Sequence, residues 1–334
     1  MPSRFNGILH RYGAEKLTAF EFKTGDKPKP NTLIFIGGLT DGLGSVTLVD
    51  DIVEALEDTE WSVFTVLLSS SYKGFGTSTL DQDVKEIAQC VKYALQYKKE
   101  TNGGKDGLVS IMGHSTGSQD VLHYIYTADS KAILNRPQVD GAIMQSPVSD
   151  REAVLHLANG SSQVQEALEK LIAIAKQGTV TADGHEIILP NDLVDKLDMF
   201  PPCTPLTARR FLSLVSPDSP LKPEADDLFS SDLTEERLQE TFGVVAERGT
   251  LRGSMLILYG GNDEYVPPTV DKEKLVSRWE AIVKKSSPEK EIWDANSGIV
   301  PGATHAIDDI SLTGPRQDVA RRVKSFLAKV AASA

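Results

Sequence analysis

Short apolar segments alternate with helical patterns over the first 150 residues of this 334-residue chain. The segment TLIFIG at 32–37 and the β-branched segment WSVFTVLL at 61–68 are typical of strands buried on both faces. A Ser/Thr/Asp cluster precedes the long amphipathic helix expected at 80–97. Strands that alternate with helices pair in parallel, so we predict a doubly wound α/β sheet. The same pattern predicts strands at 107–112 and 139–145 and helices at 48–56 and 115–127.

The alternation stops near residue 150 and resumes only at the apolar segment SMLILY, residues 254–259. Residues 151–249 contain helical patterns, such as 153–177, and no strong strand pattern. Because an insertion of this length exceeds an ordinary loop, we expect a largely helical cap at 151–249 on a core formed by 1–150 and 250–334. A weaker strand at 290–292 or 299–300 and a final helix at 316–332 complete the expected core.

Composition narrows the range of functions. A net charge of -12 argues against nucleic acid or an anionic membrane as the main partner, since both need a basic surface. The N-terminal residues MPSRFNGILHRYG contain no apolar segment typical of a signal peptide, and no apolar run reaches the length of a membrane span. The two cysteines, Cys90 and Cys203, form neither a disulfide framework nor a four-ligand metal pattern. We therefore expect a cytoplasmic protein without a bound metal.

The sequence IMGHSTGS at 111–118 places Ser115 between two glycines, each two residues away. Glycines at these positions let backbone segments approach where side chains would clash, and the serine then projects its Oγ above the sheet in a strained conformation. The apolar segment before the serine and the helical pattern after it are the context that this nucleophile motif requires. The alternative is an ordinary strand-to-helix turn, in which Gly and Ser are common.

A serine hydroxyl needs a base within hydrogen-bonding distance to act as a nucleophile. Of the six histidines, His305 lies in PGATHA, a glycine-containing loop before the last helix, where the base is expected. His114 adjoins Ser115, but neighbours on such a turn point apart, so we expect it to pack beside the turn or to contact substrate. The remaining histidines are expected in core, surface or cap positions: His10, His123, His156 and His185.

The acid that orients the base is expected after a strand between Ser115 and His305. Asp263 follows LILYGGN at the end of a predicted strand, and ligands of such sheets gather at the carboxyl ends of the strands. The chain order Ser115, Asp263, His305 is the order expected for this type of serine motif. The alternative is that Asn262-Asp263 only forms a turn, and the rival acids are Glu264, Asp308 and Asp309.

Two backbone amides are expected to bind the negative oxygen of the reaction intermediate. One belongs to Thr116, the residue after the nucleophile. The other comes from the loop after the strand at 32–37, where Gly37-Gly38 lets the backbone turn its amides inward, so Leu39 or Gly38 is the expected donor. A phosphate-binding glycine loop is the weaker alternative, because neither G-x-x-x-x-G-K-[ST] nor G-x-G-x-x-G occurs here.

Several motifs resemble those of a known group. They are GGLTDGL, SSSYKGFGTSTLDQDVKEI, GHSTGSQD, QSPVSDRE and GGNDEYVP, and they span nearly the whole chain. The chain resembles the α/β-hydrolase superfamily and, within it, a fungal and eukaryotic family of an uncharacterised conserved domain. At least one branch of that family is described as siderophore esterases that act on fusarinine-type ester bonds. The resemblance implies an α/β-hydrolase fold with the cap after the sixth strand, and it carries over the roles of Ser115, Asp263 and His305.

Together these features predict a serine esterase that acts on a small-molecule ester through an acyl-enzyme and needs no cofactor. Tyr72, Phe75 and Arg151 are candidate substrate contacts, as is His114; a polar loop and surface ion pairs are the alternatives for them. There are two alternative functions. The same three residues could act on a lactone, thioester or amide, or the protein could bind a ligand without turnover. No feature of the sequence defines an oligomeric state.

Overall fold

The central element is a sheet of eight strands in the order β1-β2-β4-β3-β5-β6-β7-β8. The computed structural model describes residues 4–14, 16–25, 27–129, 135–182 and 184–334. Strands β3 to β8 pair in parallel, whereas β1 and β2 form an antiparallel hairpin that joins the edge at β4. The strands are β1 (Gly7–Tyr12), β2 (Leu17–Phe22), β3 (Asn31–Ile36), β4 (Trp61–Leu67), β5 (Val109–His114), β6 (Gly141–Gln145), β7 (Met255–Gly260) and β8 (Gly298–Val300).

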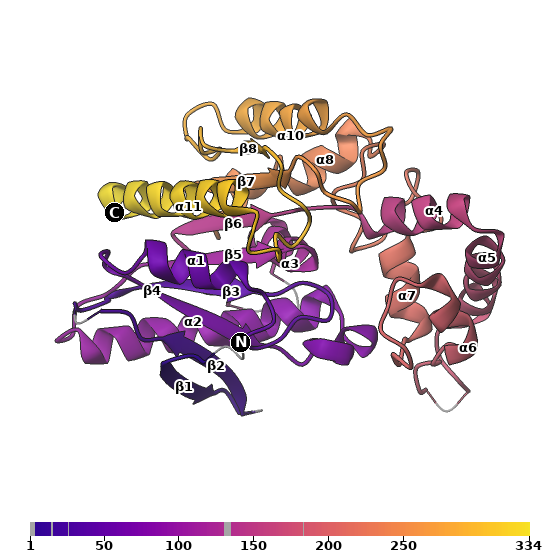
Figure 1. Cartoon of the computed structure of the whole chain (residues 1–334), viewed down its shortest axis with the longest axis horizontal. Helices are drawn as coiled ribbons and strands as arrows, with labels where there is room; N and C mark the ends of the chain where they lie inside the picture. The colour runs from indigo at the N-terminus through magenta and orange to yellow at the C-terminus, as the bar shows by residue number, and fades with distance from the viewer. Residues whose placement is uncertain (1–3, 15, 26, 130–134, 183) are drawn as a thin grey trace.

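Helices cover both faces of this sheet (Figure 1). On one face, α1 and α11 pack together through residues such as Ile52 and Val323. On the other, α2, α3 and α10 bury residues such as Ile87, Val121 and Trp279 against the strands. These flanking helices are α1 (Leu48–Ala55), α2 (Leu80–Thr101), α3 (Thr116–Tyr126), α10 (Lys272–Ser286) and α11 (Thr313–Ser333). The predicted doubly wound sheet is therefore confirmed.

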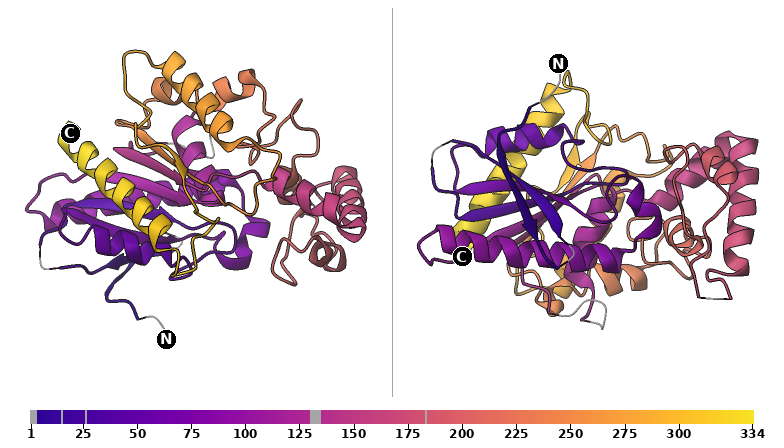
Figure 2. Two further views of the ribbon diagram at one scale, coloured as in Figure 1. Left: turned by 45° about the horizontal axis from the view of Figure 1, so that its top comes forward. Right: turned by 90° about the horizontal axis from the view of Figure 1, so that it is seen from below.

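A lobe of helices stands beside the carboxyl ends of the parallel strands, as both views of Figure 2 show. It follows β6, the sixth strand, and has a hydrophobic cluster of its own that includes Val154, Leu171 and Phe211. Its helices are α4 (Asp150–Gly160), α5 (Ser162–Gln177), α6 (Asn191–Val194) and α7 (Ala208–Val215), with the short 3-10 helix η2 (Asp195–Leu197). The long helix expected at 153–177 is thus two helices, because Ser161 ends α4 and its side chain caps α5 by accepting from Val164 N.

The last part of the insertion packs on the core instead of on this lobe. Two short helices lie here, α8 (Glu235–Thr241) and α9 (Val245–Arg248). The hydrophobic cluster around Trp279 includes Leu238 of α8, Val245 of α9, and Phe242 between the two helices. The ring of Phe242 stacks on that of Trp279, with 5.3 Å between the ring centroids.

The weaker strand formed at 298–300, where it pairs with β7, and not at 290–292. None of the helices in the described ranges is long and apolar enough to cross a membrane. Because β3, β5, β6, β7 and β8 run in parallel, the loops that follow them meet at one edge of the sheet. Every residue predicted as nucleophile, base, acid or oxyanion donor lies in one of these loops or at the start of α3.

Candidate active site

Ser115 sits at the junction of β5 and α3 in a backbone conformation that only glycine adopts without strain. Its φ is 54° and its ψ is -122°, which costs about 1–3 kcal/mol and persists only when the surroundings impose it. The Ser115 amide donates to the carbonyl oxygen of Gln145 on β6 at 2.9 Å, and the Ser115 carbonyl accepts from Ser118 N at 2.8 Å. These bonds hold the serine in the sharp turn.

The two glycines of the motif are required by contacts between backbones. A Cβ atom on Gly113 would lie 2.0 Å from the carbonyl oxygen of Gly117, and one on Gly117 would lie 2.5 Å from that of Ile36. A side chain at 113 would therefore push the start of α3 away from β5, and one at 117 would push it away from β3. This close approach is the physical basis of the pattern read from the sequence.

The three residues predicted as nucleophile, base and acid form one chain of hydrogen bonds. His305 Nε2 lies 2.8 Å from Ser115 Oγ, and His305 Nδ1 lies 2.8 Å from Asp263 Oδ2. A carboxylate can only accept, so Nδ1 carries the proton and Nε2 is free to accept from the serine hydroxyl. The Asp263 side chain is fully buried and that of His305 is nearly so. This arrangement is suited to proton transfer from the serine.

The rival acids are engaged elsewhere. Glu264 Oε2 accepts from the His305 backbone amide at 2.9 Å, so it holds the loop and not the ring. Asp309 Oδ1 accepts from Ser311 N, and Asp308 lies on the exposed surface beside Thr47. Among the other histidines, His10 and His123 pair with acids outside the site, and His156 and His185 lie exposed in the insertion.

Leu39 and Thr116 present the amides expected to bind an oxyanion. Within the described residues, neither amide donates to a protein acceptor. The Gly38 amide, in contrast, donates to Asp41 Oδ2 at 2.8 Å, which favours Leu39 over Gly38 as the second donor. Gly38 still contributes by its size, because a Cβ atom there would lie 2.7 Å from Ser115 Cβ.

His114 lies behind the base and not in the wall of a pocket. It is buried, its Nδ1 lies 2.5 Å from Gln145 Oε1, and its ring centroid is 5.1 Å from that of His305. Burial, and secondly the nearby His305, lower the pKa of His114 to about 4, so its ring is neutral at physiological pH. These contacts support packing beside the turn over the predicted contact with substrate.

The other three predicted substrate contacts lie in different environments. Tyr72 is half exposed, and its ring lies over Gly42. Phe75 is buried and packs against Phe200 of the helical lobe, with 5.6 Å between ring centroids. Arg151 is buried at the start of α4 and is fully engaged with Asp227 and Asp232. These ion pairs argue against the predicted substrate contact of Arg151.

Two residues at the site were not predicted from the sequence. The ring of Tyr265 meets that of His305 edge to face at a centroid distance of 4.7 Å. Gln145 bonds His114 through Oε1, and its Nε2 donates to the His305 carbonyl oxygen at 3.2 Å. The position of Gln145 at the carboxyl end of a buried strand was the signal that could have identified it.

Known proteins resemble this chain over almost its full length. Fusarinine C esterase sidJ from Aspergillus fumigatus is 44% identical over 340 residues, which cover 96% of this chain and 95% of that protein. The solved structure of siderophore hydrolase EstB from Aspergillus fumigatus superposes with a TM-score of 0.88 at 44% identity and covers 98% of both chains.

More distant structures share only the fold. An alpha/beta hydrolase fold protein of unknown function superposes with a TM-score of 0.56 at 16% identity and covers 98% of this chain and 97% of that chain. The predicted α/β-hydrolase fold is therefore confirmed. Residues 1–328 match the model of a family described as "Protein of unknown function (DUF1749)". The chain belongs to the DUF1749 family.

Proposed function

We propose that this protein is a serine esterase that cleaves carboxylic ester bonds through an acyl-enzyme. The observation that carries the proposal is the chain of two 2.8 Å hydrogen bonds from Ser115 through His305 to Asp263. A nucleophile bonded to a base that is itself held by a third group is the arrangement that nucleophilic catalysis requires. The close relative named fusarinine C esterase supports ester hydrolysis as the reaction.

The acylation step follows from these contacts. Ser115 Oγ attacks the ester carbonyl carbon while His305 Nε2 accepts the hydroxyl proton. Asp263 stays ionised, keeps the proton on Nδ1 and stabilises the imidazolium. The carbonyl oxygen becomes an oxyanion that accepts from the Leu39 and Thr116 amides, each worth about a hundred- to a thousandfold in rate. His305 then donates its proton to the leaving alkoxide, and the alcohol departs.

Deacylation repeats the step with water. His305 Nε2 accepts a proton from the water that attacks the Ser115 ester, and it returns this proton to Ser115 Oγ when the acid product leaves. The neutral His114 assists this cycle indirectly, because a positive ring 5.1 Å away would oppose the charge that forms on His305. The cycle uses side chains and amides of this chain and needs no metal or organic cofactor.

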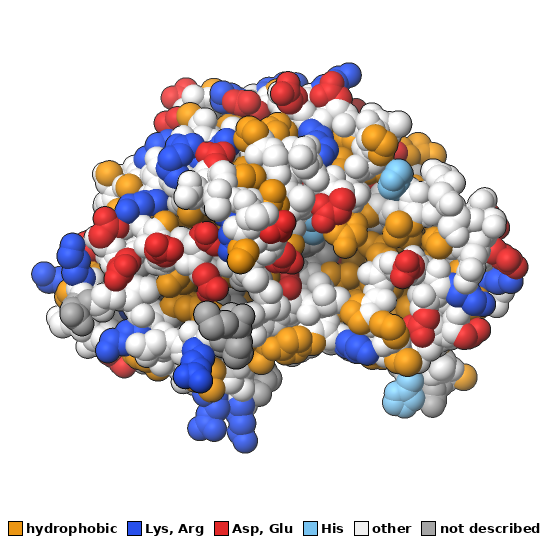
Figure 3. Space-filling view, viewed as in Figure 1, with side chains coloured by type: hydrophobic (Ala, Val, Ile, Leu, Met, Phe, Trp, Pro, Cys, Tyr) orange, Lys and Arg blue, Asp and Glu red, His pale blue; other side chains and the backbone are white. Residues whose placement is uncertain are grey.

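A siderophore ester is the proposed substrate. The relatives named for siderophore and fusarinine C hydrolysis are 44% identical over almost the whole chain, which supports carrying the substrate class over. Hydrophobic side chains gather in the hollow between the core and the helical lobe, where an organic substrate would find an apolar wall (Figure 3).

The cytoplasmic location expected from the sequence remains a prediction.

The helical lobe acts as the cap in this proposal. The predicted cap boundaries are 151–249, but the packing of Leu238, Phe242 and Val245 on the core supports a shorter cap that ends before α8. We therefore propose that residues 150–225 cover the site, with their own cluster around Leu171 and Phe211.

The test compares Ser115→Ala with wild type on p-nitrophenyl acetate and on fusarinine C. Loss of both activities in a folded Ser115→Ala protein is expected. Ser333→Ala, at the exposed end of α11, is the matched control and should retain them. Hydrolysis of the simple ester but not of fusarinine C by wild type would contradict the siderophore substrate alone. Full esterase activity in Ser115→Ala would contradict the proposed mechanism.

A further inference from the structure

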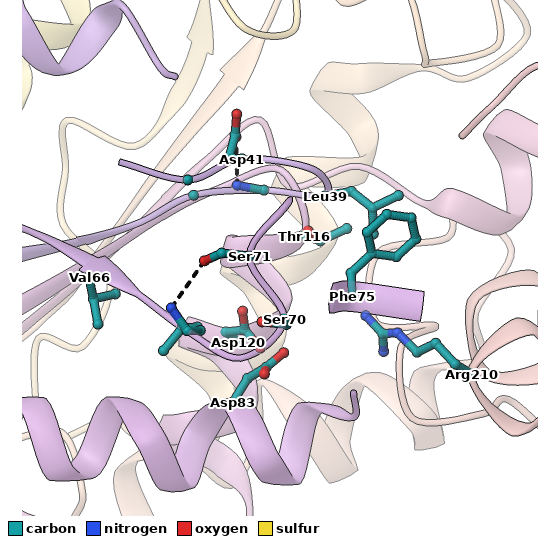
Figure 4. A pocket seen from close by; sticks show the side chains of 14 residues that line it. Leu39, Asp41, Val66, Ser70, Ser71, Phe75, Asp83, Thr116, Asp120 and Arg210 are labelled. Atoms are coloured by element: carbon teal, nitrogen blue, oxygen red, sulfur yellow. Dashed lines mark hydrogen bonds between the residues drawn. The ribbon is translucent and has the colours of Figure 1, made fainter. Parts of the chain in front are cut away.

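The turn that carries the proposed oxyanion donor Leu39 is held by a side chain. Residues 38–41 form this turn just after β3, and the Asp41 amide closes it by donating to the Gly38 carbonyl oxygen at 3.0 Å. The Asp41 side chain folds back over the turn, where its Oδ2 accepts from the Gly38 amide at 2.8 Å (Figure 4). Asp41 therefore bonds both backbone groups of the residue that precedes Leu39.

The backbone of this turn needs such a restraint. Thr40 has a φ of 72°, in the left-handed region that a β-branched residue rarely adopts. The third position of a turn with this conformation favours glycine. A non-glycine residue stays there only when the surrounding structure imposes the conformation. The two hydrogen bonds between Asp41 and Gly38 impose it, because they close the turn around Leu39 and Thr40.

Asp41 is itself held from several directions. Its Oδ1 accepts from Ser45 Oγ at 2.9 Å. Its carbonyl oxygen accepts at 2.9 Å from the amide of Tyr72, the first residue of the short 3-10 helix η1 (Tyr72–Thr77). Gly37 leaves room for the side chain, since a Cβ atom on Gly37 would lie 2.5 Å from Asp41 Cβ. These contacts make Asp41 a fixed support for the turn.

The hydrogen bond to Asp41 determines which amide is available to a substrate. It occupies the Gly38 amide, whereas the Leu39 amide has no acceptor among the residues that the structure describes. The Leu39 side chain packs against the hydrophobic cluster of the helical lobe. The turn also touches the nucleophile, since a Cβ atom on Gly38 would lie 2.7 Å from Ser115 Cβ. A rotation of this turn would therefore move the Leu39 amide relative to the reacting carbonyl.

The hydrogen bonds of Asp41, and not its charge, explain its place here. Asp41 lines the same pocket as Leu39 and Thr116 (Figure 4), and a negative group there opposes the charge of an oxyanion. An asparagine side chain has one acceptor and one donor group. It would accept from the Gly38 amide and donate to Ser45 Oγ, so it would keep both contacts without the charge.

We propose that Asp41 is a positioning residue for the esterase reaction, which holds the turn 38–41 so that the Leu39 amide faces the oxyanion. Asp41 acts through the backbone and does not touch the substrate. A donor that is already in place when the charge develops stabilises the transition state without further reorganisation. The inference rests on the proposed function and adds to it the group that preorganises one of the two donors.

The test measures kcat and KM for p-nitrophenyl acetate, together with inhibition by hexyl trifluoromethyl ketone. Ser115 Oγ adds to the carbonyl carbon of this ketone and leaves a negative oxygen, while His305 keeps the serine proton. Asp41→Ala should lower kcat/KM by about tenfold to a hundredfold, mainly through kcat, because a displaced donor loses much of its effect on the rate. The inhibition constant should rise by a similar factor, since the adduct resembles the transition state.

Two further variants separate hydrogen bonding from charge. Asp41→Asn keeps both contacts and should retain kcat/KM within about threefold of wild type. Asp41→Glu keeps the charge but moves the carboxylate by one methylene group, so it should lose about as much activity as Asp41→Ala. Asp106→Ala is the control, because it removes an exposed carboxylate that pairs only with the exposed Lys99 among the described residues. It should keep the wild-type values.

The outcomes separate this inference from the proposed function. Wild-type kcat/KM in Asp41→Ala would overturn the inference and leave the esterase function intact. A loss in Asp41→Asn as large as that in Asp41→Glu, or an active Asp41→Glu, would also overturn it. These two variants decide alone if Asp41→Ala does not fold. A higher KM with an unchanged inhibition constant would make Asp41 a substrate contact and refute the positioning role. Failure of wild type to hydrolyse the ester would instead contradict the proposed function.

Discussion

Replacement of Gly38 by alanine should displace the nucleophile while leaving the chemical groups of the site intact. The added Cβ atom would lie 2.7 Å from Ser115 Cβ, 3.0 Å from the His114 carbonyl oxygen and 3.3 Å from Ser115 Oγ. Carbon atoms in contact lie about 3.5–4.0 Å apart, so the serine or the loop must move by roughly 1 Å. The φ of Gly38 lies outside the left-handed region, so alanine is disfavoured there by steric clash and not by backbone strain.

A shift of this size predicts a loss of about a hundredfold in kcat/KM, or roughly 2.7 kcal/mol of transition-state stabilisation. The free energy of unfolding should fall by about 1–3 kcal/mol, as is usual when a packed site is overfilled. The assay is the initial rate of p-nitrophenyl acetate hydrolysis, with urea unfolding measured on the same preparations.

Gly160→Ala is the matched control, because a Cβ atom on this last residue of α4 meets nothing within 4 Å. It should keep wild-type activity and stability. A folded Gly38→Ala protein with wild-type kcat/KM would refute the argument, since Ser115 would then tolerate a methyl group where the structure leaves no room.

Three further predictions concern charged or titrating groups. Asp263→Asn should lower kcat by about 10⁴-fold in a folded protein, because the amide favours the wrong tautomer of His305; activity near wild type would contradict this. Burial lowers the pKa of His114 to about 4, against 6.5 in the unfolded chain. The free energy of unfolding of the protein should therefore fall by up to about 3 kcal/mol as the pH falls from 6.5 to 4, because the unfolded chain binds the proton first. Urea unfolding of His114→Asn should therefore depend less on pH there than wild type, and parallel curves would refute the assignment. Burial raises the pKa of Asp150 to about 6, so ionisation of this carboxyl costs stability as the pH rises past the unfolded value of 3.8. Asp150→Asn should therefore stabilise the protein by up to about 3 kcal/mol above pH 6 and not at pH 4. An equal effect at both pH values would contradict this.

The sequence predicted the parallel part of the sheet because its strands are buried on both faces and read as continuous apolar runs. It did not predict the hairpin of β1 and β2. Gly7–Tyr12 is mostly exposed and carries polar residues, so its strand character comes from pairing with β2 and not from its own hydrophobicity. Edge strands of this kind leave only a weak local pattern.

The meeting of Ser115, Asp263 and His305 in space was predictable, because the loops that follow parallel strands lie at one edge of the sheet. The gathering of Asp83, Asp120 and Arg210 around one pocket was not, because it depends on how α2 and α3 are rotated on the sheet and on α7 of the helical lobe, which carries Arg210. The ion pairs of Arg151 were not predictable for the same reason, since its partners Asp227 and Asp232 lie more than seventy residues further along the chain.

The central claim is that His305 activates Ser115. Labelling with a fluorophosphonate, followed by mass spectrometry to locate the adduct, tests it most directly in wild type and in His305→Ala. The account predicts a single adduct on Ser115 in wild type that nearly vanishes in His305→Ala. An adduct on another residue, or equally fast labelling of Ser115 without His305, would contradict it.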